Sequence, residues 1–470
     1  MINYSKKIEN LFDVLWPFNR SITGDGVRQT HKEISKIINI KTSEIPSGKK
    51  VYDWTIPEEW NPIEAYVLDD NGKKIIDFKK NNLHLLNYSQ PFQGFLSLDK
   101  LKKHLYYDKK NPTAVPYKTS YYKKNWGLCL SYNEFKKLKK GNYFVYINVK
   151  FSKGSITFSE LLLPGKSKKE ILIHTYTCHP SLAINELTGP VLATYLAKEL
   201  GLRKNRFFSY RFVFTSETIG TISYINKKEK SLKKNIIAGL VLTCLGIKNY
   251  ITFKKSRNQN SLINSSFINL KNSLQKKNKV KIIEFSPSGS DERQYCSLGI
   301  NLPIATFMSK KCGEYKEYHT SLDDKSIVSF KNLNNNIKTL LKLFNQIEKN
   351  YKKKNYSSEM INNLSIKNKN KNKNKSKSKS KNKIKRYDKI FPFIKITKCE
   401  PHLSKWKIHY GTRDHKIADI QTHATKWLIH FSNGKNSIDQ IGKMSKINPE
   451  LIYKVSLIMK KSKLISFKKK

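Results

Sequence analysis

Cysteine is sparse in this chain. Six cysteines are scattered over 470 residues, and no two are spaced as a Cys-x-x-Cys pair. This scatter argues against a disulfide framework and against a structural zinc knuckle. A reduced, cytoplasmic setting fits the cysteine usage best, and we expect the protein there.

Long apolar runs are also lacking. The longest, residues 236–247, is too short to cross a bilayer and contains Gly239, so it predicts a buried strand. Residues 1–20 carry charge but no continuous apolar core. We therefore expect neither a signal peptide nor a membrane span.

Acidic residues are few: 36 Asp and Glu stand against 90 Lys and Arg, which gives a formal net charge of +54. Such a charge usually suggests nucleic acid or an anionic membrane as a partner. Here lysine is enriched together with asparagine and isoleucine along almost the whole chain, as AT-rich coding produces, while arginine is scarce. We attribute the charge to codon bias and do not expect nucleic acid as a partner.

Strands alternate with helices over residues 158–350. Apolar runs predict strands at 170–174, 210–214 and 239–245, and a helix at 187–201. Nearly continuous apolar strands indicate a parallel or mixed sheet covered on both faces. Polar residues that follow such strands are expected at the carboxyl edge of the sheet.

The regions on either side of residues 158–350 have different sequence patterns. The pattern of residues 41–157 predicts short strands and turns, with a hairpin signal at 69–72. Residues 367–385 hold ten lysines and no acid, which predicts a disordered linker. Three helical patterns beyond residue 388, followed by a short apolar run, resemble a winged helix-turn-helix, for which we favour protein contact over DNA binding. The predicted division is a catalytic α/β domain of residues 1–40 and 140–352, a β-rich insert of 41–139, a linker of 353–387, and a winged-helix domain of 388–470.

Four polar residues are candidates for a hydrolytic metal site. His179, Glu217 and His319 each follow an apolar strand, and Glu186 precedes a helix. Zinc takes imidazole nitrogen and carboxylate oxygen, and a catalytic site leaves one position for water. Each residue also has a structural alternative: a satisfied histidine for His179, a surface-loop histidine for His319, and a helix-terminal acid for Glu186 and Glu217.

Two further candidates follow the turn at Gly289. Arg293 is positioned to bind a substrate carboxylate, and Tyr295 to donate a hydrogen bond to a developing oxyanion. The alternative for Arg293 is an internal ion pair with Asp291 or Glu292.

These segments together resemble the zinc aminopeptidase family. More closely, the chain resembles the aminopeptidase-like proteins of bacterial surface-polysaccharide gene clusters, which carry a small inserted domain and a C-terminal winged helix. The supporting stretches are Asn19–Gly26, Asp53–Asn61, Pro116–Tyr122, Cys178–Glu186, Glu217–Gly220, Gly289–Cys296 and Tyr318–Asp323. The resemblance implies an α/β, three-layer zinc-exopeptidase-like fold with a mixed sheet.

The chain departs from the wider family at three carboxylates. The bridging aspartate falls on Asn185, the second glutamate on Thr218, and a further aspartate on Thr243. A two-zinc site cannot be completed without them. The resemblance then implies one zinc ion, held by His179, Glu186 and His319.

The expected function is metal-dependent hydrolysis of an amide bond in a peptide, amino-acyl or surface-polysaccharide precursor. Glu217 is the expected general base on the metal-bound water, with a pKa raised by an apolar environment. The alternative is a catalytically degraded peptidase fold that serves as a scaffold or binding protein. A homo-oligomer or a protein partner would contact the winged helix.

Overall fold

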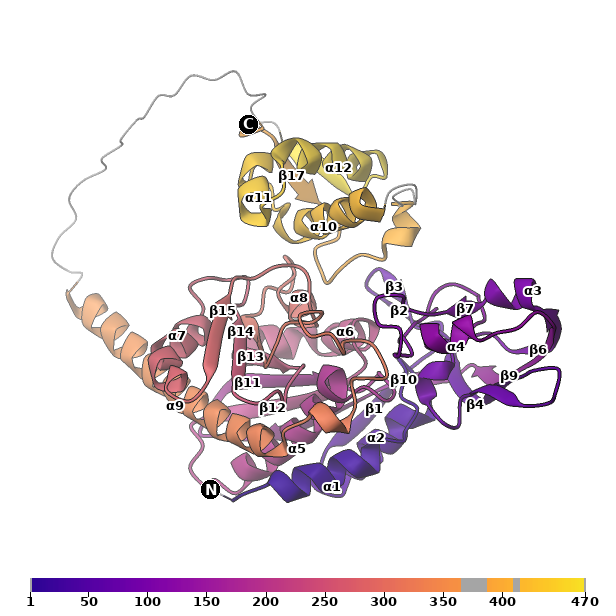
Figure 1. The fold of residues 1–470 in the computed structure, drawn as a ribbon. Helices are drawn as coiled ribbons and strands as arrows, with labels where there is room; N and C mark the ends of the chain where they lie inside the picture. The colour runs from indigo at the N-terminus through magenta and orange to yellow at the C-terminus, as the bar shows by residue number, and fades with distance from the viewer. Residues whose placement is uncertain (1, 365–386, 409–414, 469–470) are drawn as a thin grey trace.

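A mixed eight-stranded sheet forms the centre of the computed structural model, which describes residues 2–364, 387–408 and 415–468 (Figure 1). Its strand order is β1-β10-β12-β11-β13-β16-β14-β15. The pairs β11–β12, β11–β13 and β13–β16 are parallel, whereas β1–β10, β10–β12 and β14–β16 are antiparallel. The strands are β1 (Lys41–Pro46), β10 (Ser155–Leu163), β11 (Ser167–Tyr176), β12 (Phe208–Thr215), β13 (Ile236–Leu242), β14 (Tyr250–Lys254), β15 (Lys279–Ile283) and β16 (Ile304–Met308).

Helices cover both faces of this sheet, so three layers result. Successive residues of β11 enter different cores: Ile171 and Ile173 pack with one helical layer, and Leu172 packs on the opposite face. The first layer contains α1 (Ser5–Leu15), α2 (Asp25–Ser35), α5 (Thr188–Gly201), α7 (Leu262–Gln275) and α9 (Phe330–Leu364). The second contains α6 (Ile219–Asn235) and α8 (Glu292–Tyr295). The predicted mixed sheet with two covered faces is confirmed.

A second, four-stranded sheet lies to one side of the central sheet (Figure 1). It has the order β5-β4-β9-β6, with β4 (Glu59–Leu68), β5 (Lys74–Asp77), β6 (Phe92–Ser97) and β9 (Asn142–Ser152). Smaller elements surround it: β2 (Lys50–Val51), β3 (Trp54–Thr55), η1 (Asn82–His84), α3 (Leu98–Lys102), β7 (Leu105–Tyr106), β8 (Leu128–Cys129) and α4 (Tyr132–Lys136). The range 41–139 expected for the insert differs from this sheet at both ends, because β1 pairs with β10 in the central sheet and β9 pairs with β4.

The described residues of the C-terminal part form three α-helices, one short 3-10 helix and a strand pair. Its elements are β17 (Phe391–Ile394), η4 (Leu403–Trp406), α10 (His415–Phe431), α11 (Ile438–Ser445), α12 (Pro449–Lys461) and β18 (Ile465–Lys468), and β17 pairs with β18 antiparallel. The Asn448 side chain caps α12 by accepting from the Glu450 amide at 2.8 Å. The three predicted helices are confirmed, while the winged-helix assignment remains a prediction.

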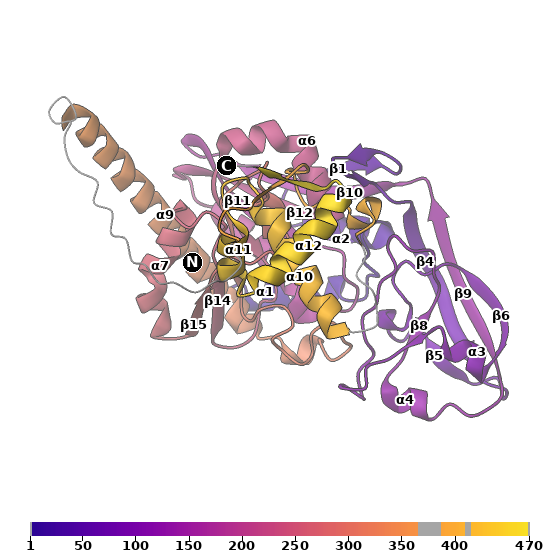
Figure 2. The same cartoon turned by 90° about the horizontal axis from the view of Figure 1, so that it is seen from above.

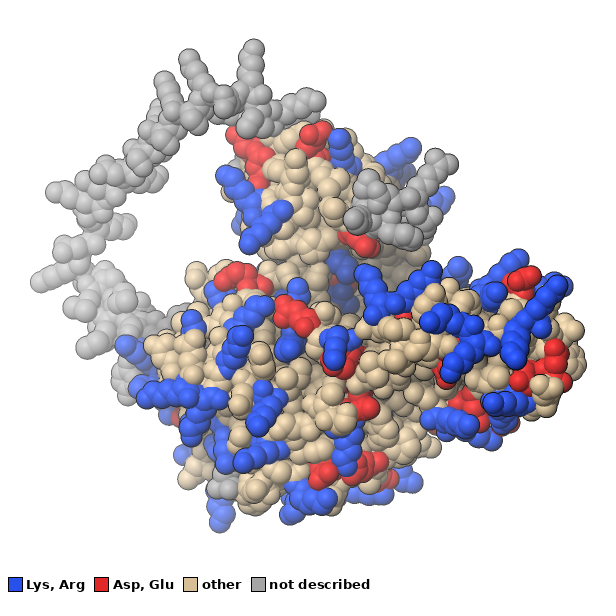
Figure 3. Space-filling view, in the orientation of Figure 1, with Lys and Arg blue, Asp and Glu red and all other residues tan. Residues whose placement is uncertain are grey.

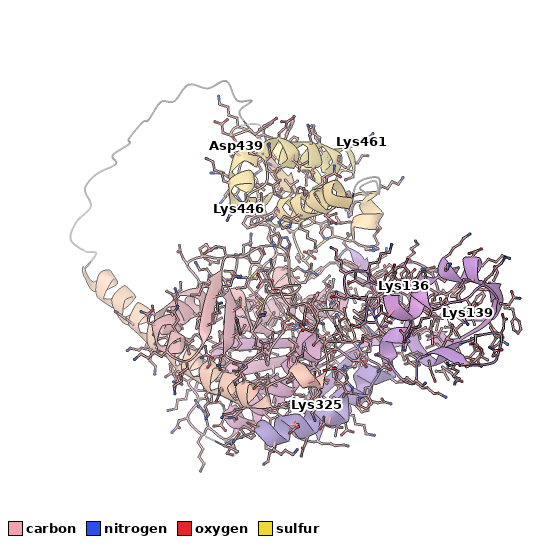
Figure 4. The ribbon with its side chains drawn as sticks, in the orientation of Figure 1. Lys136, Lys139, Lys325, Asp439, Lys446 and Lys461 are labelled. Atoms are coloured by element: carbon pink, nitrogen blue, oxygen red, sulfur yellow. The ribbon has the colours of Figure 1, made fainter. Side chains whose placement is uncertain are left out.

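Part of the range expected for the linker, 353–387, is helical. Helix α9 continues to Leu364, and residues 365–386 of the expected linker lie outside the described residues. Among the described residues, no helix is both long and apolar enough to cross a membrane. Lysine and arginine side chains are scattered over the visible face of the central-sheet domain, the insert and the C-terminal part, with fewer acids between them (Figure 3). The labelled lysines come from all three parts: Lys136 and Lys139 from the insert, Lys325 from the central-sheet domain, and Lys446 and Lys461 from the C-terminal part (Figure 4).

Residues 397–406, which we call the strap, connect the C-terminal part to the rest of the chain. The C-terminal part lies over the rest of the chain in both views (Figures 1 and 2). The Gly299 amide donates to the carbonyl of Thr397 at 2.7 Å, and the Glu400 amide donates to Gln294 Oε1 at 2.9 Å. The indole of Trp54, from the inserted hairpin β2–β3, donates to the carbonyl of Glu400 at 2.7 Å. The strap therefore contacts both the α8 segment and the insert.

Candidate functional site

A cavity of about 330 Å³ opens at the carboxyl ends of β11 and β12, where the sequence placed the polar candidates. Parallel strands end at the same edge of a sheet, which brings the loops after β11 and β12 together. The cavity is lined by Ile22, Trp54, Tyr117, Thr119, Tyr121, Tyr122, Cys178, His179, Glu217, Thr218, Ile219 and His319. Its walls therefore combine histidine and carboxylate groups with an aromatic surface.

Cys178, His179 and Glu186 form a compact donor cluster beside the cavity. One ligand atom from each residue lies within 4.8 Å of the other two, and all three residues are buried. Cys178 Sγ lies 3.3 Å from His179 Nδ1. Thiol, imidazole and carboxylate are a donor set that zinc accepts, and Glu186 Oε1 has no hydrogen-bond partner among the described residues. The residues present thus fit a metal ion.

Glu186 is held by Arg20 in a fully buried ion pair. Glu186 lies in a π-helical turn, Ala183–Leu187, between β11 and α5. Arg20 Nε contacts Glu186 Oε2 at 3.1 Å, and both side chains are inaccessible to solvent. Burial raises the pKa of Glu186 to about 7, and the Arg20 charge opposes that rise. The expected ligand is therefore also the counter-ion of a buried guanidinium.

Glu217 faces His179 across the cavity. Glu217 Oε2 lies 3.9 Å from His179 Nε2, and the Glu217 backbone amide donates to Cys178 Sγ at 3.2 Å. Burial, and next the charge of Asp291, raise the pKa of Glu217 to about 8, while the charge of Arg293 opposes the rise. A carboxylate with a raised pKa at a cavity wall has the character of a general base.

His319 reaches the cavity wall but stands outside the compact donor cluster. Its ring centroid lies 5.6 Å from that of His179, and Tyr117 of the insert approaches both rings, at 5.2 Å and 5.1 Å. The Tyr117 amide donates to the carbonyl of His319 at 2.8 Å, which fixes a backbone with φ of +56°. Its Nε2 is buried with no partner among the described residues, and burial lowers the pKa of His319 to about 4. The imidazole is thus a neutral base.

Asp323 holds the turn that carries Glu186. Its carboxylate accepts from the backbone amides of Ile184 at 2.6 Å and Asn185 at 2.9 Å. The Tyr315 hydroxyl donates to it at 3.1 Å. The carboxylate therefore satisfies the first amides of the π-helical turn.

A neutral hydrogen bond joins two of the three positions at which a carboxylate is missing, Asn185 and Thr243. The carbonyl of Asn185 accepts from the hydroxyls of Tyr176 at 2.8 Å and Thr243 at 3.0 Å. The Nδ2 of Asn185 is buried without a partner among the described residues. The structure places Glu186 in the donor cluster.

Arg293 and Tyr295 occupy other positions than we expected. Tyr295 is fully buried, and its hydroxyl lies 3.1 Å from Nδ1 of His174, whose Nε2 bonds Asp291 at 3.0 Å. This contact leaves Tyr295 in the core, away from the cavity lining, because the short helix α8 packs its side chain inward. The Arg293 guanidinium reaches Glu400 at 3.5 Å and Thr218 Oγ1 at 3.1 Å.

Neither acid proposed as an internal partner pairs with Arg293. Asp291 bonds His174, and Glu292 pairs with Lys254 Nζ at 2.6 Å. The partner of Arg293 is Glu400 of the strap, so this arginine links the cavity edge to the C-terminal part.

An aromatic wall and three buried supports were missed from the sequence. Trp54, Tyr117, Tyr121 and Tyr122 come from the insert, and the Tyr117 and Tyr121 hydroxyls lie 2.8 Å apart. The supports are Arg20, His174 and Asp291. The charged and aromatic residues inside otherwise ordinary loops, Asn19–Gly26 and Pro116–Tyr122, were the available signal.

Comparison with known proteins shows the family to which the chain belongs. The family described as a domain of unknown function, DUF4910, matches residues 9–350. A Clostridium acetobutylicum protein, described as a polysaccharide biosynthesis protein with an aminopeptidase-like domain, is 42% identical over 344 residues, covering 73% of this chain and 78% of the relative.

Solved structures agree. A crystal structure of a candidate peptidase from Clostridium acetobutylicum has 34% identity and a TM-score of 0.71, covering 99% of this chain and 96% of that one. A zinc aminopeptidase from Bacillus subtilis has 11% identity and a TM-score of 0.54, covering 73% of this chain and 93% of its own, and so shares the fold. The resemblance to aminopeptidase-like proteins of polysaccharide biosynthesis is confirmed, and the chain belongs to the DUF4910 family, with a zinc-aminopeptidase-like fold.

Proposed function

We propose that this chain is a metal-dependent hydrolase that cleaves an amide bond. The observation that carries the proposal is the Glu217 carboxylate, 3.9 Å from the His179 imidazole at the wall of a cavity. A base and a metal-ligating imidazole in one water-accessible pocket are what amide hydrolysis needs. Hydrolase relatives with this fold support the assignment.

The metal would be held by His179 and Glu186, with Cys178 as the third close donor. His319, which we expected as a ligand, supplies an unpartnered nitrogen at the same wall. We propose a single zinc ion. When bound, it supplies Lewis acidity that polarises the scissile carbonyl group.

The residues of this chain then have distinct tasks. Glu217 removes a proton from the attacking water and returns it to the leaving amine, which its raised pKa favours. The Arg293 guanidinium donates a hydrogen bond to Thr218, and its charge opposes a further rise of the pKa of Glu217. Arg20 and Asp323 fix the turn bearing Glu186, so the donor is held in place before substrate binds.

The aromatic wall indicates the substrate class. Tyr117, Tyr121, Tyr122 and Trp54 line the cavity, and no lysine or arginine is among its lining residues in the described structure. A free carboxylate or phosphate would find no cationic side chain there, whereas a sugar ring or an apolar side chain would pack on the rings. Because the Clostridium acetobutylicum relative is described in polysaccharide biosynthesis, we propose an N-acylated or amino-acylated glycan precursor, with short peptides as the second class.

Glu217→Gln tests the proposal. The amide cannot accept the proton, so turnover of N-acylated amino sugars and aminoacyl anilides should fall by about 10²–10⁴-fold. Bound metal, measured by mass spectrometry, should be unchanged. Glu284→Gln is the matched control, because Glu284 is exposed and pairs with Lys255 on the surface. Undiminished turnover in Glu217→Gln would contradict the assignment.

A scaffold protein is the second candidate, and the neutral residues at 185 and 243 favour it. Their hydrogen bonds hold the turn without a metal ion. Purified protein that contains only traces of zinc, and that turns over neither substrate class after zinc is added, would support the scaffold. Zinc in equal amount to protein would support the enzyme.

A further inference from the structure

Two cysteines lie in contact behind the cavity. The Sγ atoms of Cys244 and Cys312 are 3.6 Å apart. Cys244 directly follows Thr243 at the end of β13 and is fully buried, and Cys312 is partly exposed on the loop after β16. We propose that these two thiols form a reversible disulfide when the protein meets an oxidant of the peroxide class, which makes the pair a modification site.

The backbone around the two thiols already brings them together. The Ser309 amide donates to the carbonyl of Cys244 at 2.8 Å, three residues before Cys312. Both cysteines belong to one small apolar cluster that also contains Met308 and Tyr315. An S–S bond is about 2.05 Å long, so the sulfurs must approach by about 1.5 Å, which rotation of the Cys312 side chain and its loop can supply.

The two thiols differ in access and acidity. The hydrogen bond to Cys312, and next burial, raise the pKa of Cys244 well above its ordinary value. The hydrogen bond from Cys244 lowers the pKa of Cys312. Cys312 is therefore the thiol that reacts first, and Cys244 resolves the product.

The steps balance without a further reactant. The Cys312 thiolate attacks one oxygen of hydrogen peroxide, which breaks the O–O bond and leaves a sulfenic acid and, after proton uptake, water. Cys244 sulfur then attacks Cys312 Sγ, the S–O bond breaks, and the proton of Cys244 leaves with the hydroxyl as a second water. Two thiols are oxidised and one peroxide is reduced, and a small dithiol reverses the change.

A disulfide between Cys244 and Cys312 would affect residues that support the candidate site. Cys312 lies on the segment that leads to His319, and the neighbour of Cys244, Thr243, donates to the carbonyl of Asn185. Cys178, the cysteine of the cavity, faces the imidazole of His179 and not a second sulfur. The oxidisable pair is thus separate from the donor cluster, although it is adjacent to its supports.

Peptide mapping of the full-length protein tests this inference. The reduced protein is treated with a small excess of hydrogen peroxide, digested without reductant and analysed by mass spectrometry. We expect one cross-linked peptide pair that contains residues 244 and 312, lacks two hydrogen atoms and separates again with dithiothreitol. Cys296→Ser, the matched control, should form the same cross-link.

The resolving step has its own readout. In Cys244→Ser, Cys312 should accumulate as a sulfenic acid that dimedone labels, whereas the unsubstituted protein should give little label. Sulfenic or sulfinic acid at Cys312 in the unsubstituted protein without a cross-link would overturn the inference, as would a different cysteine pair forming first. The unsubstituted digest decides alone if Cys244→Ser fails to fold, and none of these measurements depends on turnover.

Discussion

Removing Arg20 should destabilise the fold in a way that depends on pH. Arg20 and Glu186 are both fully buried, and their contact is 3.1 Å. Arg20→Ala leaves an unpaired buried carboxylate, for which the cost is about 3–5 kcal/mol. This cost applies where Glu186 is ionised, and it falls where Glu186 carries a proton.

The direction with pH follows from the pKa of Glu186. Burial raises this pKa from 4.5 to about 7 in the folded protein. Between these values the unfolded chain releases a proton that the folded chain retains, so rising pH lowers stability by about 3 kcal/mol and the loss levels off above pH 7. Without Arg20 the pKa of Glu186 in the folded protein is higher still, so the stability of the variant continues to fall above pH 7.

The assay is urea unfolding followed by tryptophan fluorescence at pH 5 and pH 8, with chelator present. Arg20→Ala should lose about 1–3 kcal/mol at pH 5, from packing and the hydrogen bond to Leu15. It should lose about 1 kcal/mol more at pH 8, because the folded variant there keeps a proton on Glu186 that the unsubstituted protein has released. The double variant Arg20→Ala with Glu186→Gln should recover part of the loss at pH 8, because a neutral amide needs no counter-charge.

Arg28→Ala is the matched control. Arg28 is partly exposed and pairs with Glu59, whose pKa its guanidinium lowers, so Glu59 is ionised at both pH values. Its loss should therefore be nearly the same at pH 5 and pH 8. An Arg20→Ala loss that is equal at the two pH values would refute our account of the buried pair.

Two further substitutions test the supports of the site. Asp323→Ala leaves the buried amides of Ile184 and Asn185 without an acceptor, at about 1–3 kcal/mol each, so thermal unfolding should shift clearly downward, and a loss below 1 kcal/mol would contradict the capping role. Glu400→Gln removes the charge that faces Arg293, so hydrogen exchange of residues 397–402 should speed up, and unchanged exchange would show that the strap does not depend on this ion pair.

The position of the candidate residues at strand ends was predictable, because it follows from the local sequence pattern and one topological rule. Apolar runs located β11, β12 and β13, and parallel pairing then brought His179 and Glu217 to the same edge. Loop residues after strands need no long-range knowledge once the sheet is parallel. The core of the candidate site was accessible to sequence reasoning for this reason.

Long-range supports were not predictable. Arg20 reaches Glu186 across 166 positions, and Asp323 reaches Ile184 across 139. Sequence spacing carries no signal for such contacts. Arg293 illustrates the same difficulty. We expected it to bind a substrate carboxylate, with an adjacent acid as the alternative partner, but it contacts Glu400 on the strap that the C-terminal part supplies. Tyr295 was misplaced because a helix of four residues shows no periodicity from which an inward face can be recognised.

The pKa values of the ionisable groups at the cavity are the argument for the hydrolysis that we propose. Burial raises the pKa of Glu186 and Glu217 and lowers that of His179, so each charged form is disfavoured where it stands. Glu186 has a structural role as the counter-ion of Arg20. Glu217 lies at the cavity wall with a raised pKa, which is the character that a hydrolase would use.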